Sequence, residues 1–256
     1  MTLKVFITGA SSGIGEALAV YYADRGARLG LAARRGERLA ALDQRLGGGH
    51  ACYPLDVADA PALHASAADF IARFGAPDIV IASAGVSAGT LTEHAEDLAV
   101  FRRIMDINVV GMAATFTPFI PAMRAAGGER RLVGIASVAG IRGLPGAAAY
   151  SASKAAAIAY LESLRLEMRP AGIKVVTIAP GYIETPMTAV NPYPMPFLMP
   201  AGRAAARFAA AIERGISYTV IPWPMGIVAK LLRLLPNGVY DRLFTHAPRK
   251  PRGLLK

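Results

Sequence analysis

The chain alternates short, almost uninterrupted apolar runs with longer segments that have helical periodicity. Residues 3–10 (LKVFITGA) form the first apolar run, and residues 13–25 form the first helical segment. The alternation continues, so we expect further strands at 28–33, 51–57, 78–85, 131–137 and 173–181. Helices are expected between them at 37–46, 61–74, 96–126 and 149–168. This order indicates a parallel sheet covered by helices on both faces.

The residue composition of the chain changes after Gly181. Residues 185–200 are rich in Pro and Met and are predicted to be irregular, because Pro does not fit a central strand or a helix interior. A helix at 203–215 and a seventh strand at 217–222 follow. We therefore predict one doubly wound α/β (Rossmann) domain over 1–222, with a seven-stranded parallel sheet, and a C-terminal helical basic extension over 223–256.

The extension carries two short apolar helices within 223–244, and then ten residues rich in Pro and basic side chains that we expect to fray. In residues 226–236 the apolar surface is broader than a surface helix needs. We expect the domain or a partner subunit to cover it, with lipid as the less favoured alternative.

Composition limits the function. The chain has 256 residues and a net charge of +10, of which +6 lies in residues 222–256, so a nucleic-acid partner is not expected. One cysteine excludes a disulfide framework, and four dispersed histidines give no metal-ligand spacing. The N-terminus leads directly into a strand without a signal-peptide pattern, and no charge-free apolar run approaches about 20 residues, so we expect a cytoplasmic location.

A glycine-rich turn, residues 8–15 (TGASSGIG), follows the first strand and opens the first helix. Gly9 permits a tight turn, Gly13 lets backbone approach a pyrophosphate, and Gly15 permits close packing of helix on strand. The helix N-terminus then presents free N–H groups to phosphate. A turn in this context predicts a nucleotide site.

Later in the chain, the side chains of Ser137, Tyr150 and Lys154 suit acid–base chemistry. Tyr150 and Lys154 are one helical turn apart and share a face. A cation beside a phenol lowers its pKa, which suits proton exchange with a carbonyl or alcohol. Ser137 ends the fifth strand, where ligands of open α/β sheets bind, so it is placed to bond the reacting oxygen.

The TGxxxGIG spacing at 8–15 and the YxxxK motif at 150–154 resemble the short-chain dehydrogenase/reductase (SDR) family, in its single-domain branch. The resemblance covers about residues 3–185. It implies that Tyr150 exchanges the proton, Ser137 fixes the oxygen, Lys154 holds the nicotinamide ribose and Asn108 supports a proton relay. Residues 82–85 (ASAG) lack both asparagines of the family's NNAG, which affects bracing of the sheet rather than the cofactor.

The resemblance also implies a set of cofactor-binding residues, in which Asp56 contacts the adenine, while Ile183 and Thr185 contact the nicotinamide carboxamide. Two structural alternatives stay open: Asp56 as a turn or N-cap residue, and Asn108 as a buried structural amide. The full set is Gly9, Ser11, Ser12, Gly13, Ile14, Gly15, Arg34, Arg35, Asp56, Val57, Ala84, Gly85, Asn108, Tyr150, Lys154, Pro180, Gly181, Ile183 and Thr185.

The second strand ends in Ala33-Arg34-Arg35, without an acidic residue to bind the ribose 2′-OH. Arginine pairs with phosphate, so NADP(H) is favoured over NAD(H), with Arg34 as the first choice of clamp and Arg35 as the second.

These features predict an NADP(H)-dependent oxidoreductase that interconverts a carbonyl and an alcohol. The loop and helix at about 185–215 are mainly expected to select the substrate, and their apolar character favours a hydrophobic one. Residues 223–244 are expected to flank its entrance. The alternatives are an NADP(H)-sensing regulator or a membrane-surface protein on the same fold, whereas a sugar-nucleotide epimerase is disfavoured by the glycine spacing.

The resemblance also implies self-association. Small and apolar residues are frequent in the helices at about 107–126 and 150–168, which pack against symmetry mates in the family. We therefore expect a homodimer or a homotetramer.

Overall fold

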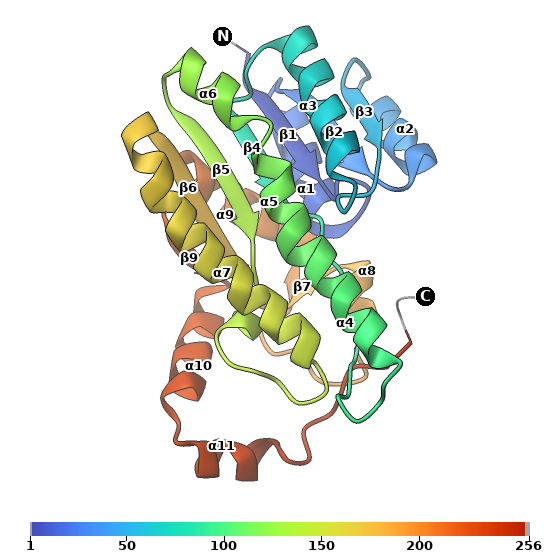
Figure 1. Cartoon of the computed structure of the whole chain (residues 1–256), viewed down its shortest axis with the longest axis vertical. Coiled ribbons are helices and arrows are strands. Elements are labelled where there is room, and N and C mark those ends of the chain that lie inside the picture. Colours follow the sequence, from blue (N-terminus) through green and yellow to red (C-terminus); the bar gives the residue numbers. More distant parts are fainter. Residues whose placement is uncertain (1, 254–256) are drawn as a thin grey trace.

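The computed structural model describes residues 2–253 and confirms the doubly wound fold. Seven strands form one parallel sheet in the order β3-β2-β1-β4-β5-β6-β9 (Figure 1). Their bounds are β1 Lys4–Thr8, β2 Arg28–Ala33, β3 Ala51–Pro54, β4 Ile79–Ala82, β5 Arg130–Ile135, β6 Ile173–Pro180 and β9 Tyr218–Ile221. The strand order reverses between β1 and β4, so a ligand crevice is expected at their carboxyl ends.

Helices cover both faces of the sheet (Figure 1). One face packs against α1 (Gly13–Ala23), α2 (Gly36–Arg45) and α9 (Ala201–Glu213). The other packs against α3 (Ala60–Phe74), α5 (Gly111–Phe116), α6 (Ile120–Ala126) and α7 (Ala148–Met168). Because both faces are buried, the central strands are apolar at almost every position rather than at alternate ones.

The single helix expected over 96–126 is interrupted. It divides into α4 (Asp97–Met105), a π-helical turn η1 (Asp106–Val110), α5 and α6. The run Asp97–Ala126 is apolar and long enough to cross a membrane by composition alone. However, Ile104, Phe116 and Met123 are buried in the domain, so its apolar character is explained by packing.

The predicted irregular segment 185–200 contains regular structure, which corrects that expectation. The strands β7 (Ile183–Glu184) and β8 (Met199–Pro200) pair across it, and α8 (Pro186–Ala189) lies within it. Thr185 caps α8, since its side chain accepts from Thr188 N–H while the Thr188 hydroxyl accepts from Thr185 N–H. The sequence signal was therefore a capping pair with Pro at the first helical position.

The C-terminal extension is helical as predicted, with α10 (Trp223–Leu234) and α11 (Asn237–Phe244) at the end of the molecule where the strands finish (Figure 1). Met225 and Ala229 of α10 are buried, but the apolar surface of this helix is only partly covered. Trp223, Ile227 and Leu231 remain exposed in this chain.

The fraying expected of the last ten residues is wrong for the part that the structure describes. Residues 247–253 return from α11 to the body of the molecule near α4 (Figure 1). Pro251 O accepts from Gly89 N–H at 2.9 Å, and Arg252 forms ion pairs with Glu96 and Asp97. The remaining residues of that stretch, 254–256, lie outside the described residues.

Candidate functional site

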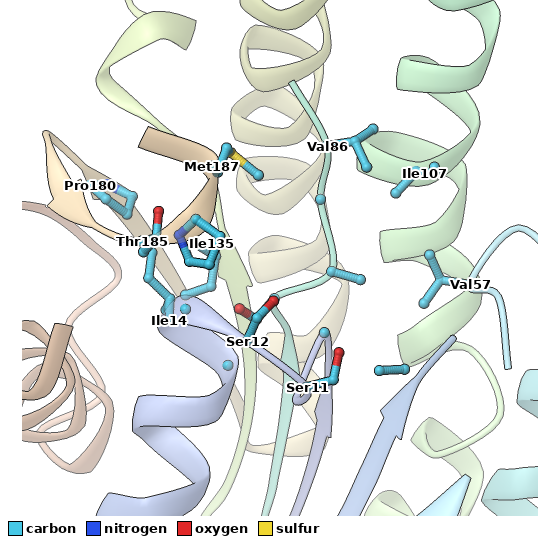
Figure 2. Close-up of a pocket in the computed structure, with 18 of the residues that line it drawn as sticks. Ser11, Ser12, Ile14, Val57, Val86, Ile107, Ile135, Pro180, Thr185 and Met187 are labelled. Carbon is cyan, nitrogen blue, oxygen red and sulfur yellow. The ribbon is translucent and has the colours of Figure 1, made fainter. Parts of the chain in front are cut away.

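A cleft of about 220 Å³ opens at the carboxyl ends of β1, β4, β5 and β6, where the topology places a ligand crevice. We call it the main cleft. Figure 2 shows the glycine turn at its floor, with Pro180, Thr185 and Met187 on one side and Val57, Val86 and Ile107 on the other.

The glycine turn is built by close backbone approaches. A Cβ on Gly15 would lie 2.3 Å from Gly9 O, and one on Gly9 would lie 2.8 Å from Ala84 N. Ser12 is the N-cap of α1 but its side chain makes no capping bond, so the first N–H groups of the helix face the cleft unsatisfied by a cap. This cradle fits a phosphate or pyrophosphate without further charged groups.

Arg35 spans the mouth of this cradle. Its Nη2 donates to Ser11 Oγ at 3.1 Å and to Ser12 Oγ at 2.9 Å. Burial, followed by the nearby Arg38 and Arg34 guanidiniums, lowers the pKa of Arg35. An anion beside this cluster would relieve the repulsion between like charges. Arg34 also lines the cleft, but it is Arg35 that contacts the glycine turn.

The main cleft brings together nearly all the cofactor residues expected from the sequence. Asn108 is the exception, because it lies behind the wall. Residues in the lining that sequence reasoning did not identify are Ala33, Leu55, Ser83, Val86, Ile107, Ile135, Ala136, Pro186, Met187 and Thr188. Most of them are apolar neighbours of the identified positions.

Asp56 is both a turn residue and part of the cleft wall. Its Oδ1 accepts from Ala58 N–H at 3.0 Å, which is the geometry of an Asx turn, while Oδ2 pairs with Arg103. Burial acts to raise the pKa of Asp56, but these two partners outweigh it and hold the pKa below its usual value. The N-cap of α3 is Asp59, which accepts from Ala62 N–H.

Ser137 and Tyr150 lie side by side at the end of β5. Ser137 is buried and also caps η2 (Val138–Gly140), accepting from Ala139 N–H at 3.1 Å. Burial raises the pKa of Tyr150, and the hydrogen bond with the Ser137 side chain partly opposes this. The phenol is therefore protonated at neutral pH, the form that can give a proton.

Lys154 lies beside Tyr150 but bonds a backbone carbonyl in this structure, and its effect on the pKa of Tyr150 stays a prediction. Its Nζ donates to Ile135 O at 2.9 Å and lies 5.8 Å from the centroid of the Tyr150 ring. Burial lowers the pKa of Lys154 to about 8, because no carboxylate compensates the ammonium. The side chain nevertheless lines the main cleft beside Tyr150.

Asn108 has the contacts of a structural amide. Its Oδ1 accepts from Val86 N–H at 2.8 Å, and its Nδ2 donates to Val86 O and Ser153 Oγ, both at 3.0 Å. It thus ties the loop after β4 to α7, and the π turn η1 directs it inward. Its part in a proton relay stays a prediction.

A second cavity of about 270 Å³, which we call the side cavity, adjoins the main cleft. Ser137, Tyr150, Gly181, Met187 and Thr188 line both. The rest of its wall is mostly apolar and includes Val138, Leu144, Tyr182, Tyr193, Phe244 and Pro248. Acid–base groups therefore lie where the main cleft meets a mostly apolar cavity.

The doubly wound fold and the glycine turn at the main cleft are typical of dinucleotide-binding oxidoreductases. Comparisons with known proteins point to the same class. The family model described as short chain dehydrogenase matches residues 3–193. The chain belongs to the short-chain dehydrogenase/reductase family. Among the described residues, no group of three or more His, Cys, Asp or Glu is placed to hold a metal ion.

Two similar proteins are named as an oxidoreductase and a dehydrogenase. An uncharacterized oxidoreductase of Myxococcus xanthus is 40% identical over 92% of this chain and 93% of its own length. An 11-beta-hydroxysteroid dehydrogenase-like 2 of Arabidopsis thaliana is 38% identical over 83% of this chain and 70% of its own length.

Two solved structures with this fold are described as complexes with a nicotinamide cofactor, one with NADP and one with NAD. A short chain dehydrogenase from Burkholderia cenocepacia, in complex with NADP, has a TM-score of 0.81 at 25% identity and covers 94% of this chain and 97% of its own. One from Burkholderia phymatum, in complex with NAD, has a TM-score of 0.82 at 24% identity, with 99% and 98% covered, which shows the fold alone.

Proposed function

We propose that the protein is an NADP(H)-dependent oxidoreductase that interconverts a carbonyl and an alcohol on a hydrophobic substrate. The observation that carries the proposal is the position of Ser137 and Tyr150, which line both the main cleft and the side cavity. A substrate in the side cavity would meet both hydroxyl groups at the boundary with the cofactor site.

The residues have separate tasks in this proposal. When bound, the nicotinamide supplies a hydride to the substrate carbon. The protonated Tyr150 gives its proton to the substrate oxygen, and Ser137 holds and polarises that oxygen by a hydrogen bond. Lys154 is proposed to turn from Ile135 O to the ribose hydroxyls, and its ammonium then stabilises the phenolate that Tyr150 leaves.

NADP(H) is proposed over NAD(H) on the charge at the end of β2. Arg34 and Arg35 line the cleft, and Arg35 already bonds two serine hydroxyls in the glycine turn. No acidic residue lies among the lining residues at this strand end. A 2′-phosphate would accept charge-assisted hydrogen bonds from these guanidiniums.

The experiment is an assay of aliphatic, steroidal and acyl-carrier ketones with NADPH and with NADH. We expect cofactor consumption with hydrophobic ketones and a preference for NADPH. A regulator that senses NADP(H) would bind the cofactor and turn over none of the ketones. That outcome would favour the regulator over the enzyme.

We infer that the chain forms a homo-oligomer, dimer or tetramer, through the α4–α7 face. The helices α4 and α7 lie side by side (Figure 1), and exposed apolar side chains occur on α4 (Leu98), on η1 (Val110) and on α7 (Leu166). Burial of such side chains against a second copy would remove apolar surface from water.

Light scattering at micromolar concentration tests the inference. We expect a dimer or tetramer for the natural chain, and a shift toward monomer for Leu98→Glu with Leu166→Glu. The charge changes should disrupt the interface without altering the buried core. A monomeric natural chain would contradict the inference.

A second candidate role is association with an anionic membrane surface, at the cytoplasmic location that we expect. On α10, Trp223, Ile227, Leu231 and Leu234 recur at intervals of three or four residues and are all exposed. Lys230 and Arg233 lie beside this stripe, and residues 223–240 contain no acidic side chain. An apolar stripe flanked by cations is typical of interfacial helices.

Co-sedimentation with phosphatidylserine-containing and neutral vesicles tests this role. We expect binding to the anionic vesicles, with each basic residue near the surface contributing about 1 kcal/mol. Leu231→Glu with Leu234→Glu should abolish it, whereas Leu166→Glu on α7 should retain it. Absence of the natural chain from both pellets would exclude the role and leave a second protein copy to cover α10.

A further inference from the structure

The C-terminal segment 247–253 closes one wall of the side cavity. Ala247, Pro248 and Lys250 line the cavity beside Phe244 of α11. The segment then reaches the loop after β4, where Pro251 O accepts from Gly89 N–H at 2.9 Å. It is a fixed part of the wall because both its backbone and its side chains are held.

Specific contacts hold residues 247–253 against the loop after β4. A Cβ on Gly89 would lie 2.1 Å from Lys250 O, so only glycine admits the segment at this depth. Beyond it, Arg252 Nε donates to Asp97 Oδ2 at 2.8 Å and Nη2 donates to Glu96 Oε1 at 2.9 Å. Asp97 is itself buried and also accepts from Leu91 N–H at 2.8 Å. These contacts hold the chain at and just after Lys250.

Lys250 places a positive charge in the wall of the side cavity, and no acidic residue among those that line the cavity pairs with it. Its Nζ donates to Met187 O at 3.1 Å, and Met187 lines both cavities. Among the residues that line the side cavity, none is Asp or Glu, and Lys250 is the one basic side chain. The lysine is partly buried, and desolvation lowers its pKa to about 8. A single neutral carbonyl leaves two of its three ammonium protons for another acceptor.

We propose that Lys250 is a specificity-determining residue that binds an anionic group of the substrate, so that the preferred substrates are apolar ketones or alcohols bearing a carboxylate or similar anion. This rests on the proposed function for the reaction itself. The apolar wall would hold the body of such a molecule, and the ammonium would pair with its charged end at the wall formed by the C-terminal segment. A charge-assisted bond in a partly desolvated site is stronger than a neutral one.

The test uses octanoate and octanamide, which have nearly the same shape and differ in charge. Calorimetric titration of the full chain, with and without saturating NADP⁺, reads binding without requiring turnover. We expect octanoate to bind at least about tenfold more tightly than octanamide, as a charge-assisted hydrogen bond implies. Lys250→Met should bring the two affinities within about threefold of each other.

Two further variants make the result specific. Lys250→Gln retains an N–H donor for Met187 O, so the segment can stay seated, yet it should lose the preference as Lys250→Met does. Lys230→Met removes an exposed lysine of α10 outside the cavity and should keep the preference.

The inference is overturned if octanoate does not bind the natural chain, if both ligands bind it equally, or if the Lys250 variants keep the preference. Failure of the proposed function would look different. The natural chain would then consume neither nicotinamide cofactor with any ketone, while the octanoate preference and its loss in the Lys250 variants would persist.

Discussion

Replacement of Tyr150 by phenylalanine should lower kcat for ketone reduction by about 10²–10⁴-fold, the range that general acid catalysis supplies. The substitution removes one hydroxyl and leaves the ring in place, so the packing of α7 should be preserved. Affinity for NADPH should be nearly unchanged, because we propose that the glycine turn and the arginines make most of the cofactor contacts. Steady-state kinetics together with a fluorescence titration of NADPH would separate the two effects.

Tyr160→Phe is a matched control, since Tyr160 lies on the same helix and outside both cavities. It should retain the kcat of the natural chain. A Tyr150→Phe variant that turns over a genuine substrate at nearly the natural rate would show that another group supplies the proton.

Charge reversal at the end of β2 should change the choice of cofactor. Arg34→Asp and Arg35→Asp each remove a partner of the 2′-phosphate and add a like charge. Loss of a charge-assisted pair costs about 1.5–3 kcal/mol, so NADPH affinity should fall by about 10- to 150-fold or more. NADH lacks the phosphate, and its affinity should change much less. We expect the larger effect from Arg35→Asp, because Arg35 also bonds Ser11 and Ser12.

Arg38→Asp tests whether local charge alone explains such a shift. Arg38 is exposed on α2 next to Arg35 but does not line the main cleft. The Arg38→Asp substitution should weaken NADPH binding only modestly. Equal affinities of the natural chain for NADPH and NADH, or tighter binding of NADH, would refute the preference.

Much of the fold could be predicted from local patterns. Strands such as β1 and β4 are buried on both faces and therefore appear as continuous apolar runs. The glycine turn could be predicted because its close approaches, as at Gly9 and Gly15, exclude any side chain. Tyr150 and Lys154 share a helix face, so their spacing alone places them together.

Other features depend on tertiary contacts that no local pattern records. The π turn at η1 directs Asn108 toward Val86 and Ser153, which are distant in sequence. The basic C-terminal segment has the composition of a fraying end, yet Gly89 and Asp97 hold it against the side cavity. Lys154 lies near Tyr150 but bonds Ile135 O, a choice that helix geometry does not determine.

Transfer of deuterium to a ketone from NADPH that carries deuterium at both C4 positions would test the central proposal most directly. The label should appear at the carbinol carbon of the alcohol product, formed in equal amount to the NADP⁺ released, and this transfer should be nearly lost in Tyr150→Phe. An alcohol without label, or oxidation of NADPH without any alcohol, would contradict the proposed function.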